Sequence, residues 1–210
     1  GQILQLIVNA DKIDIELPLF GEFNVENILA VVAAMVVMEY STVDIGEVLS
    51  RLKPVLGRMD IIDSPGKPRI IVDYAHTPDA LKKALQSVRL HFPGKKLHCV
   101  FGCGGDRDKN KRAVMGGIAE RLADEVILTS DNPRSENPSD ILAEIELGMK
   151  TQGLRIVNRR EAILHAINGA GEEDVVLVAG KGHEDYQIIG DKIINFCDRA
   201  WVEQLLKGGC

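Results

Sequence analysis

The residues best suited to bind a ligand are residues 131–134, which read DNPR. They follow the apolar run EVILTS, so they stand where a buried strand is predicted to end. The guanidinium of Arg134 offers a fork of donors that matches a carboxylate in two parallel hydrogen bonds. Pro133 restricts the backbone that presents this side chain. The segment predicts a carboxylate site, with the alternative that Arg134 only pins its loop to a neighbouring acid.

A second polar group follows another predicted buried strand, in the motif AGKGHED at residues 179–185. Gly180 and Gly182 bracket a lysine, and glycines at such a position let the backbone approach a ligand closely. Glu184 can accept hydrogen bonds from an ammonium group. Together with Arg107 and Arg134, it suits a ligand that carries both carboxylates and an amine, such as an amino acid.

Two further polar segments have ordinary explanations beside functional ones. Asp73 and His76, in VDYAHTPD, fit a binding site or a plain strand exit. The glycines of GCGG at residues 102–105 could cradle an anion, and a cationic loop with Arg107 follows them. The motif matches neither GxxxxGK[ST] nor GxGxxG, so a tight turn explains it equally well.

The elements that must position these residues alternate from residue 66 onward. Apolar strands are predicted within residues 67–76, 96–102, 124–130, 154–158 and 173–180. Helical spacing between and after them predicts helices within 77–92, 111–123, 137–150, 159–170 and 198–208. This alternation predicts an α/β, Rossmann-like fold with a mostly parallel, doubly wound sheet. The segment 187–196 predicts a hairpin turning at Gly190 and Asp191, expected to add an antiparallel edge to that sheet.

In an open parallel sheet, ligands bind beyond the carboxyl ends of the strands. All four polar segments follow predicted strands, so we expect them to converge along one edge of the sheet. That shared position is a stronger argument for a site than any single motif.

Residues 1–56 follow a different pattern. Residues 4–18 alternate like antiparallel strands, and the apolar run 28–38 predicts a buried helix. That run falls far short of the roughly 20 residues that a membrane span requires. We expect no complete core in this segment and place a domain boundary near Gly57. Residues 1–56 are then the tail of a domain that begins upstream, and residues 57–210 form a second domain.

Composition limits the function classes. The chain has 210 residues, 45% of them hydrophobic and 27% charged, which is typical of a soluble globular protein. Its net charge of −6 argues against a broad nucleic-acid surface. The four cysteines, including Cys210, lack paired metal spacing, which favours reduced thiols, no metal site and a cytoplasmic location. No basic segment of a secretory signal opens the chain, and no membrane association is expected.

Six motifs, in order along essentially the whole chain, resemble those of the Mur ligases: GEFNVEN, LGRMD, VDYAHTPDALKKAL, FGCGGDRDKNKR, DNPR and AGKGHEDYQ. The resemblance implies three domains, for the UDP substrate, for ATP and for the incoming amino acid. By this likeness, residues 1–56 are the end of the central ATP-binding domain. Residues 57–210 are the C-terminal, Rossmann-like domain that carries the amino acid.

The resemblance also implies a ligand, because DNPR marks the family members that use meso-diaminopimelate. This amino acid differs from lysine by a second carboxylate, which an arginine can recognise. By the resemblance, the residues expected to contact it are Arg107, Asp131, Asn132, Pro133, Arg134, Gly180 and Glu184.

The resemblance assigns a second set of residues to ATP. By the resemblance, Asn27 lies on the adenine side, Arg58 on the phosphate side and Asp73 on the ribose side of the nucleotide. His76 is also expected to lie near the nucleotide.

The reaction implied for the whole enzyme is ATP-dependent addition of meso-diaminopimelate to UDP-N-acetylmuramoyl-L-alanyl-D-glutamate during peptidoglycan precursor synthesis. It proceeds through an acyl phosphate and a tetrahedral intermediate. The family's P-loop and magnesium ligands are expected upstream, and these 210 residues contain no GxxxxGK[ST]. We therefore assign no catalytic residue or metal ligand here, and we expect the chain alone to be an inactive monomer. It would meet the UDP-linked dipeptide only through the missing domains. The alternatives are a lysine-adding Mur ligase and a non-catalytic module that binds a small ligand.

Overall fold

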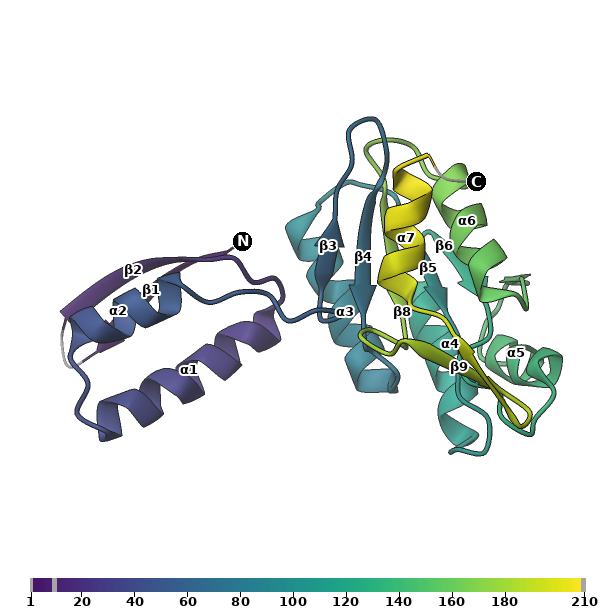
Figure 1. Ribbon diagram of the computed structural model, residues 1–210, viewed down its shortest axis with the longest axis horizontal. Coiled ribbons are helices and arrows are strands. Elements are labelled where there is room, and N and C mark those ends of the chain that lie inside the picture. The colour runs from purple at the N-terminus through teal and green to yellow at the C-terminus, as the bar shows by residue number, and fades with distance from the viewer. Residues whose placement is uncertain (1, 9–10, 209–210) are drawn as a thin grey trace. The chain divides into compact units, whose positions relative to one another are not determined.

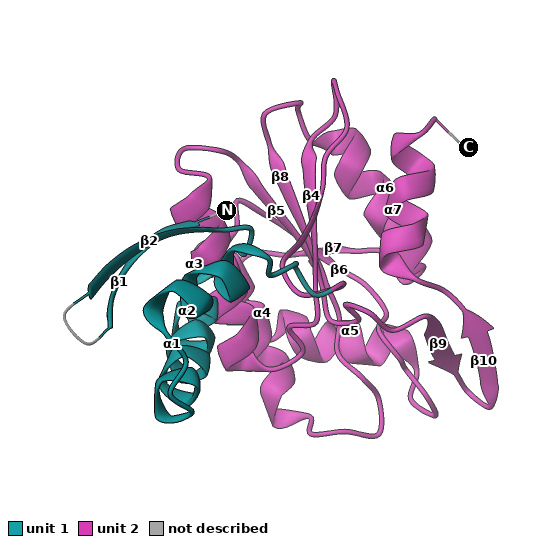
Figure 2. Cartoon of the chain, turned by 60° about the vertical axis from the view of Figure 1, so that its left-hand side comes forward, with its two compact units in different colours: residues 1–55 teal, residues 56–210 magenta. Residues whose placement is uncertain are grey.

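The computed structural model describes residues 2–8 and 11–208, and it divides the chain into two compact units. The first is Gly1–Val55 and the second is Leu56–Cys210 (Figures 1 and 2). The break falls within two residues of Gly57.

The larger unit is built on a six-stranded sheet with the strand order β3-β4-β8-β5-β6-β7. All neighbouring strands are parallel except β3, which runs antiparallel to β4. Every residue of β5 and β8 is buried, as expected for parallel strands covered on both faces. The strands are β3 (Asp60–Ile62), β4 (Arg69–Asp73), β5 (Leu97–Phe101), β6 (Glu125–Leu128), β7 (Leu154–Arg155) and β8 (Val175–Ala179).

Helices cover both faces of this sheet (Figures 1 and 2). One face carries α3 (Pro78–His91), α4 (Asn110–Leu122) and α5 (Pro138–Glu146), and the other carries α6 (Arg159–Gly169) and α7 (Asp198–Leu206). On the second face, Val72 and Val176 of the sheet share a core cluster with Ile163 and Val202 of the helices. The predicted doubly wound α/β fold is confirmed.

The helix starts follow from side chains placed at their first turns. Thr77 accepts a hydrogen bond from the Ala80 N–H at 3.3 Å, and Asn137 accepts one from the Ser139 N–H at 2.9 Å. A proline follows each of these caps, at the first position of the helix. The N–H that proline lacks would have no partner within the helix at that position. Both caps lie in loops that follow strands, so they fix the polar segments at the edge of the sheet.

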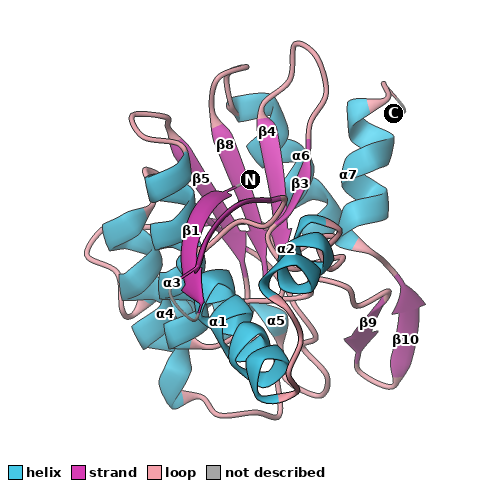
Figure 3. Ribbon diagram, turned by 90° about the vertical axis from the view of Figure 1, so that its left-hand side faces the viewer, coloured by secondary structure: helices cyan, strands magenta, loops and turns pink. Residues whose placement is uncertain are grey.

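One expected feature is wrong in its placement. The hairpin forms from β9 (Tyr186–Ile189) and β10 (Lys192–Asn195), and Gly190 at its turn has a φ of 58°. Within the described residues, however, it is a separate two-stranded sheet, visible apart from the main sheet in Figure 3. The antiparallel edge comes from β3 instead. The edge of β9 pairs with the loop after β6, through a parallel bridge between Arg134 and Ile189.

The smaller unit contains β1 (Gln2–Val8), β2 (Asp11–Leu17), α1 (Glu22–Val37) and α2 (Thr42–Ser50). The two strands pair antiparallel, as predicted. A small core does form, from Leu6, Val8, Ile15, Leu17, Ile28, Val32, Ile45 and Leu49.

The prediction that α1 is a buried helix is wrong for this structure. Only Ile28 and Val32 of α1 are buried, whereas Leu29, Val31 and Val37 are 49%, 48% and 83% exposed. One hairpin and one short helix can cover only a single stripe of a sixteen-residue helix.

Candidate functional site

A cavity of about 540 Å³ lies at the carboxyl ends of the strands in the larger unit. Segments following β4, β5, β6 and β8 line it, so the convergence expected from the sequence is present. The lining includes the predicted residues His76, Arg107, Asp131, Asn132, Arg134, Gly180 and Glu184, together with Tyr74, Lys111 and Tyr186.

Arg134 is half-buried and enters this cavity from the loop after β6. Its Nη1 donates to the carbonyl oxygens of Gly105 and Asn132, at 2.8 and 3.3 Å. Among the described residues, Nε and Nη2 have no acceptor and no carboxylate pairs with the guanidinium. The side chain is thus anchored by backbone oxygens while two of its nitrogens can still meet a carboxylate.

Glu184 belongs to a buried polar network. The ammonium of Lys181, which is 0% exposed, lies 2.9 Å from Glu184 Oε2 and 3.3 Å from Asn132 Oδ1. Asn132 Nδ2 also donates to Glu184 Oε2, at 3.0 Å. Oε1 of Glu184 has no donor among the described residues, which leaves it able to accept from an amine. Sequence reasoning singled out Glu184 and Asn132 but missed Lys181, whose only signal was its place between two glycines.

Asp131 and Pro133 lie on the same loop but face different spaces. Asp131 is 9% exposed, and its Oδ1 accepts from the Asn132 N–H at 2.7 Å. Pro133 is absent from the lining of the first cavity and lines another, of about 690 Å³, behind the loop. Of the predicted amino-acid contacts, Pro133 is therefore the one that shapes the loop rather than facing the candidate site.

The GCGG segment packs tightly against the same loop. A Cβ at Gly102 would lie 1.9 Å from the Thr129 carbonyl oxygen, and one at Gly105 would lie 1.9 Å from that of Pro133. The need for glycine at these two positions comes from this close approach, because an added Cβ would meet backbone oxygens. Arg107, beyond it, is exposed and donates from Nη1 to the Asp106 carbonyl oxygen at 3.1 Å.

The residues predicted to contact ATP are spread more widely. Asp73 is buried, and its oxygens accept from the N–H groups of Met59 and Ala75, each at 2.8 Å. Burial raises the pKa of this carboxyl group against the effect of those hydrogen bonds. Arg58 is exposed, with its guanidinium 4.5 Å from the centre of the Tyr74 ring. Neither Arg58 nor Asp73 lines the cavity.

The other two nucleotide candidates lie in different places. His76 is exposed at the cavity, with Nδ1 2.9 Å from the Tyr74 carbonyl oxygen. Asn27 belongs to α1 of the smaller unit, where its Nδ2 donates to Asn24 Oδ1 at 3.4 Å. Across the described part of the chain, no group of three or more His, Cys, Asp or Glu side chains is placed to hold a metal ion.

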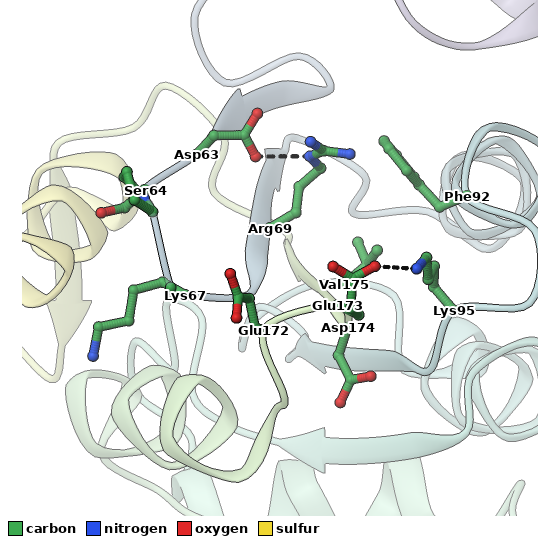
Figure 4. A pocket seen from close by; sticks show the side chains of 12 residues that line it. Asp63, Ser64, Lys67, Arg69, Phe92, Lys95, Glu172, Glu173, Asp174 and Val175 are labelled. Atoms are coloured by element: carbon green, nitrogen blue, oxygen red, sulfur yellow. Dashed lines mark hydrogen bonds and ion pairs between the residues drawn. The ribbon is translucent and has the colours of Figure 1, made fainter.

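A second hollow, of about 380 Å³, lies near the amino ends of β4 and β8 (Figure 4). Two of its three lining cations, Arg69 and Lys95, pair with Asp63 and Glu173, the first pair at 2.7 Å. These two are already neutralised by acids, unlike Arg134, and Lys67 is a single ammonium without the donor fork of an arginine. The cavity at the carboxyl ends is consequently the better candidate site.

Residues 57–182 match the family model described as the Mur ligase, glutamate ligase domain. The chain belongs to the Mur ligase family. Among solved Mur ligases, it is similar to a UDP-N-acetylmuramoyl-L-alanyl-D-glutamate–2,6-diaminopimelate ligase, with 38% identity and a TM-score of 0.71. That match covers 98% of this chain but 42% of the other, so the chain spans less than half the length of this relative.

Two more distant structures share the fold. A pseudomurein peptide ligase type C from Methanothermus fervidus is 25% identical, with a TM-score of 0.65, over 86% of this chain and 37% of that one. The UDP-N-acetylmuramate-alanine ligase MurC from Thermotoga maritima is 22% identical, with a TM-score of 0.67, over 93% and 40% of the two chains. Family membership accounts for the fold; the roles of individual residues stay predictions.

Proposed function

We propose that the chain is the amino-acid-binding part of an ATP-dependent Mur ligase that adds meso-diaminopimelate to UDP-N-acetylmuramoyl-L-alanyl-D-glutamate. The observation that carries this proposal is the placement of Arg134 and Glu184 around one cavity, each with polar atoms not engaged by the described residues. The 38% identity to a diaminopimelate ligase supports it.

In this proposal, the guanidinium of Arg134 binds the carboxylate that diaminopimelate has and lysine lacks. Nη1 keeps the side chain anchored to backbone oxygens, while Nε and Nη2 form the bidentate contact. Glu184, held by Lys181 and Asn132, accepts from an ammonium group of the same ligand through Oε1. Arg107 is exposed at the mouth of the cavity and gives a second positive group for a carboxylate.

The remaining functions belong to the rest of a longer protein. ATP would supply the phosphoryl group that activates the glutamate carboxylate, with magnesium held by other domains. The residues of this chain would bind the incoming amino acid and orient its amine. We accordingly expect a monomeric, cytoplasmic protein whose isolated chain neither hydrolyses ATP nor forms the amide. ATP hydrolysis by the purified chain, lost in Arg134→Ala, would contradict this expectation.

Calorimetric titration of the chain with meso-diaminopimelate, with lysine as the comparison ligand, tests the proposal. Losing a charge-assisted bidentate contact costs about 2–3 kcal/mol, so Arg134→Ala should weaken diaminopimelate binding about 30- to 150-fold. Lysine binding should change little. Arg121→Ala, on the exposed end of α4, is the control and should leave both affinities unchanged.

The alternatives give distinct results. Equal losses for both ligands in Arg134→Ala would show that Arg134 does not bind the second carboxylate, and would count against the diaminopimelate assignment. No binding of either ligand by the unmodified chain would contradict the proposed substrate and favour a module for another small ligand.

A further inference from the structure

The β9 strand runs beside the loop that carries Arg134 and bonds to it through the backbone. The Arg134 N–H donates to the Ile188 carbonyl oxygen at 3.1 Å, and the Gly190 N–H donates to the Arg134 carbonyl oxygen at 2.7 Å. These bonds form the parallel bridge between Arg134 and Ile189. Both backbone groups of Arg134 are thus held by the hairpin.

Two more hydrogen bonds extend this contact to the preceding residues of the loop. Gln187 is 8% exposed, and its Nε2 donates to the Asp131 carbonyl oxygen at 2.6 Å. The Ile188 N–H donates to Asn132 Oδ1 at 2.9 Å. Residues 187–190 therefore bond to three of the four DNPR residues.

The backbone of Arg134 needs such support. Its φ is 51°, in the left-handed region that residues with a Cβ adopt at an energetic cost. A conformation of this kind persists where surrounding structure over-determines it. Here the hydrogen bonds on each side of Arg134 come from β9 and from the turn at Gly190.

We propose that the β9–β10 hairpin sets the direction of the Arg134 side chain, and that Gln187 is a positioning residue for amino-acid selectivity. This inference rests on the proposed function, because selectivity is defined there by the second carboxylate. Gln187 lies behind the loop, away from the lining of the candidate site, and its Nε2 donates to two backbone oxygens of that loop, of Asp131 at 2.6 Å and of Ser130 at 3.5 Å. Its side chain thus affects the ligand by holding the loop that presents Arg134.

The first test is Gln187→Met, which keeps the length of the side chain and removes its donor. A lost hydrogen bond to a buried carbonyl should weaken meso-diaminopimelate binding about five- to tenfold. Lysine binding should change less than about twofold, because that ligand lacks the carboxylate assigned to Arg134. The measured quantity is the ratio of the two affinities, which a general loss of stability would not change.

The second test compares two glycine variants that suffer similar strain. Gly190 and Gly66 have φ values of 58° and 71°, and an added Cβ at either meets nothing within 4 Å. Gly190→Ala strains the turn that bonds to Arg134, whereas Gly66→Ala strains the turn between β3 and β4. We expect Gly190→Ala alone to lower the selectivity ratio, with similar losses of thermal stability in both.

Hydrogen exchange separates failure of this inference from failure of the proposed function. The amides of Arg134, Ile188 and Gly190 should lose protection in Gln187→Met and Gly190→Ala but keep it in Gly66→Ala. If the unmodified chain bound neither amino acid, the substrate proposal would fail. The exchange rates would still show whether the hairpin holds the loop that carries Arg134. Unchanged protection, or an unchanged selectivity ratio in a chain that does bind, would overturn the role of the hairpin.

Discussion

Cys99 and Cys103 lie deep in the larger unit, at 0% and 3% exposure. Burial raises the pKa of each thiol to about 12, because the thiolate would lose its hydration. Cys103 is itself among the residues that line the candidate site, yet it is buried and its Sγ contacts Met115 Sδ at 3.8 Å. Both thiols should be chemically inert in the folded chain.

Alkylation with iodoacetamide at pH 8 should therefore leave Cys99 and Cys103 unmodified in the native protein. Cys197 is partly exposed and should react first. Cys210 lies outside the described residues, so a Cys210→Ser background removes its signal. Peptide mass spectrometry gives the modified positions, and unfolding in urea should make all three thiols react. Rapid native labelling of Cys103 would show that the GCGG segment opens more than its packing implies.

Residue types in the motifs identified the groups around the cavity, but the sequence could not assign their partners. Asn132 lines the cavity, and its amide is also bonded to Glu184, Lys181 and the Ile188 N–H. Those partners come from segments some fifty residues away, and no local spacing rule connects them. Gln187 was missed for the same reason.

At the scale of elements, α4 and α5 approach closely because α4 contains glycine at the contact. A Cβ at Gly116 would lie 2.1 Å from the Ile145 carbonyl oxygen of α5. Backbone atoms of a packed helix cannot move aside as a flexible side chain can. The contact requires a residue without a side chain at this position.

Gly116→Ala should consequently lower the free energy of unfolding by about 1–3 kcal/mol, as in other overpacked cores. The control is Gly169→Ala at the end of α6, where an added Cβ meets nothing within 4 Å. In that variant the free energy of unfolding should rise by about 0.4–1 kcal/mol, because alanine restricts the conformations of the unfolded chain. Urea unfolding followed by circular dichroism measures both. Equal effects of the two substitutions would contradict the proposed contact.

Most elements were predictable because their patterns are local. Alternation of apolar runs with helical spacing identified β4, β5, β6 and β8 and the helices between them. The three residues of β3 are too short to form a pattern. The hairpin was recognised by its turn, but its place depends on bonds to the distant DNPR loop. The exposed face of α1 was predicted to be buried because the helix has apolar residues on all its sides. The sequence does not show which of those sides other elements cover.

At the scale of the whole molecule, the two units differ in the size of their cores. The smaller one spans 55 residues and has a core cluster of eight buried side chains. Domains near 60 residues bury only about 60% of the surface that their unfolded chain exposes, so they are marginally stable. No helix in the described ranges is long and apolar enough to span a membrane.

We expect the smaller unit to open at lower denaturant concentration than the larger one. Native-state hydrogen exchange should show the amides of α1 exchanging through a low-energy opening, and those of β5 and β8 only through global unfolding. Mass spectrometry of peptides from each unit measures the difference. Identical opening energies in α1 and β8 would show that the two units unfold as one.

The strand order has a consequence for synthesis of the chain. β8 is the last strand of the main sheet to be made, yet it lies between β4 and β5 and joins the pair β3-β4 to the trio β5-β6-β7. Until residue 179 has left the ribosome, these two groups have no strand between them and expose the edges that β8 will cover. Folding of the sheet must therefore wait for nearly the whole unit to be translated. The last strand placed is also the one that delivers Gly180 and Glu184 to the cavity, so the site is completed in the same event as the core.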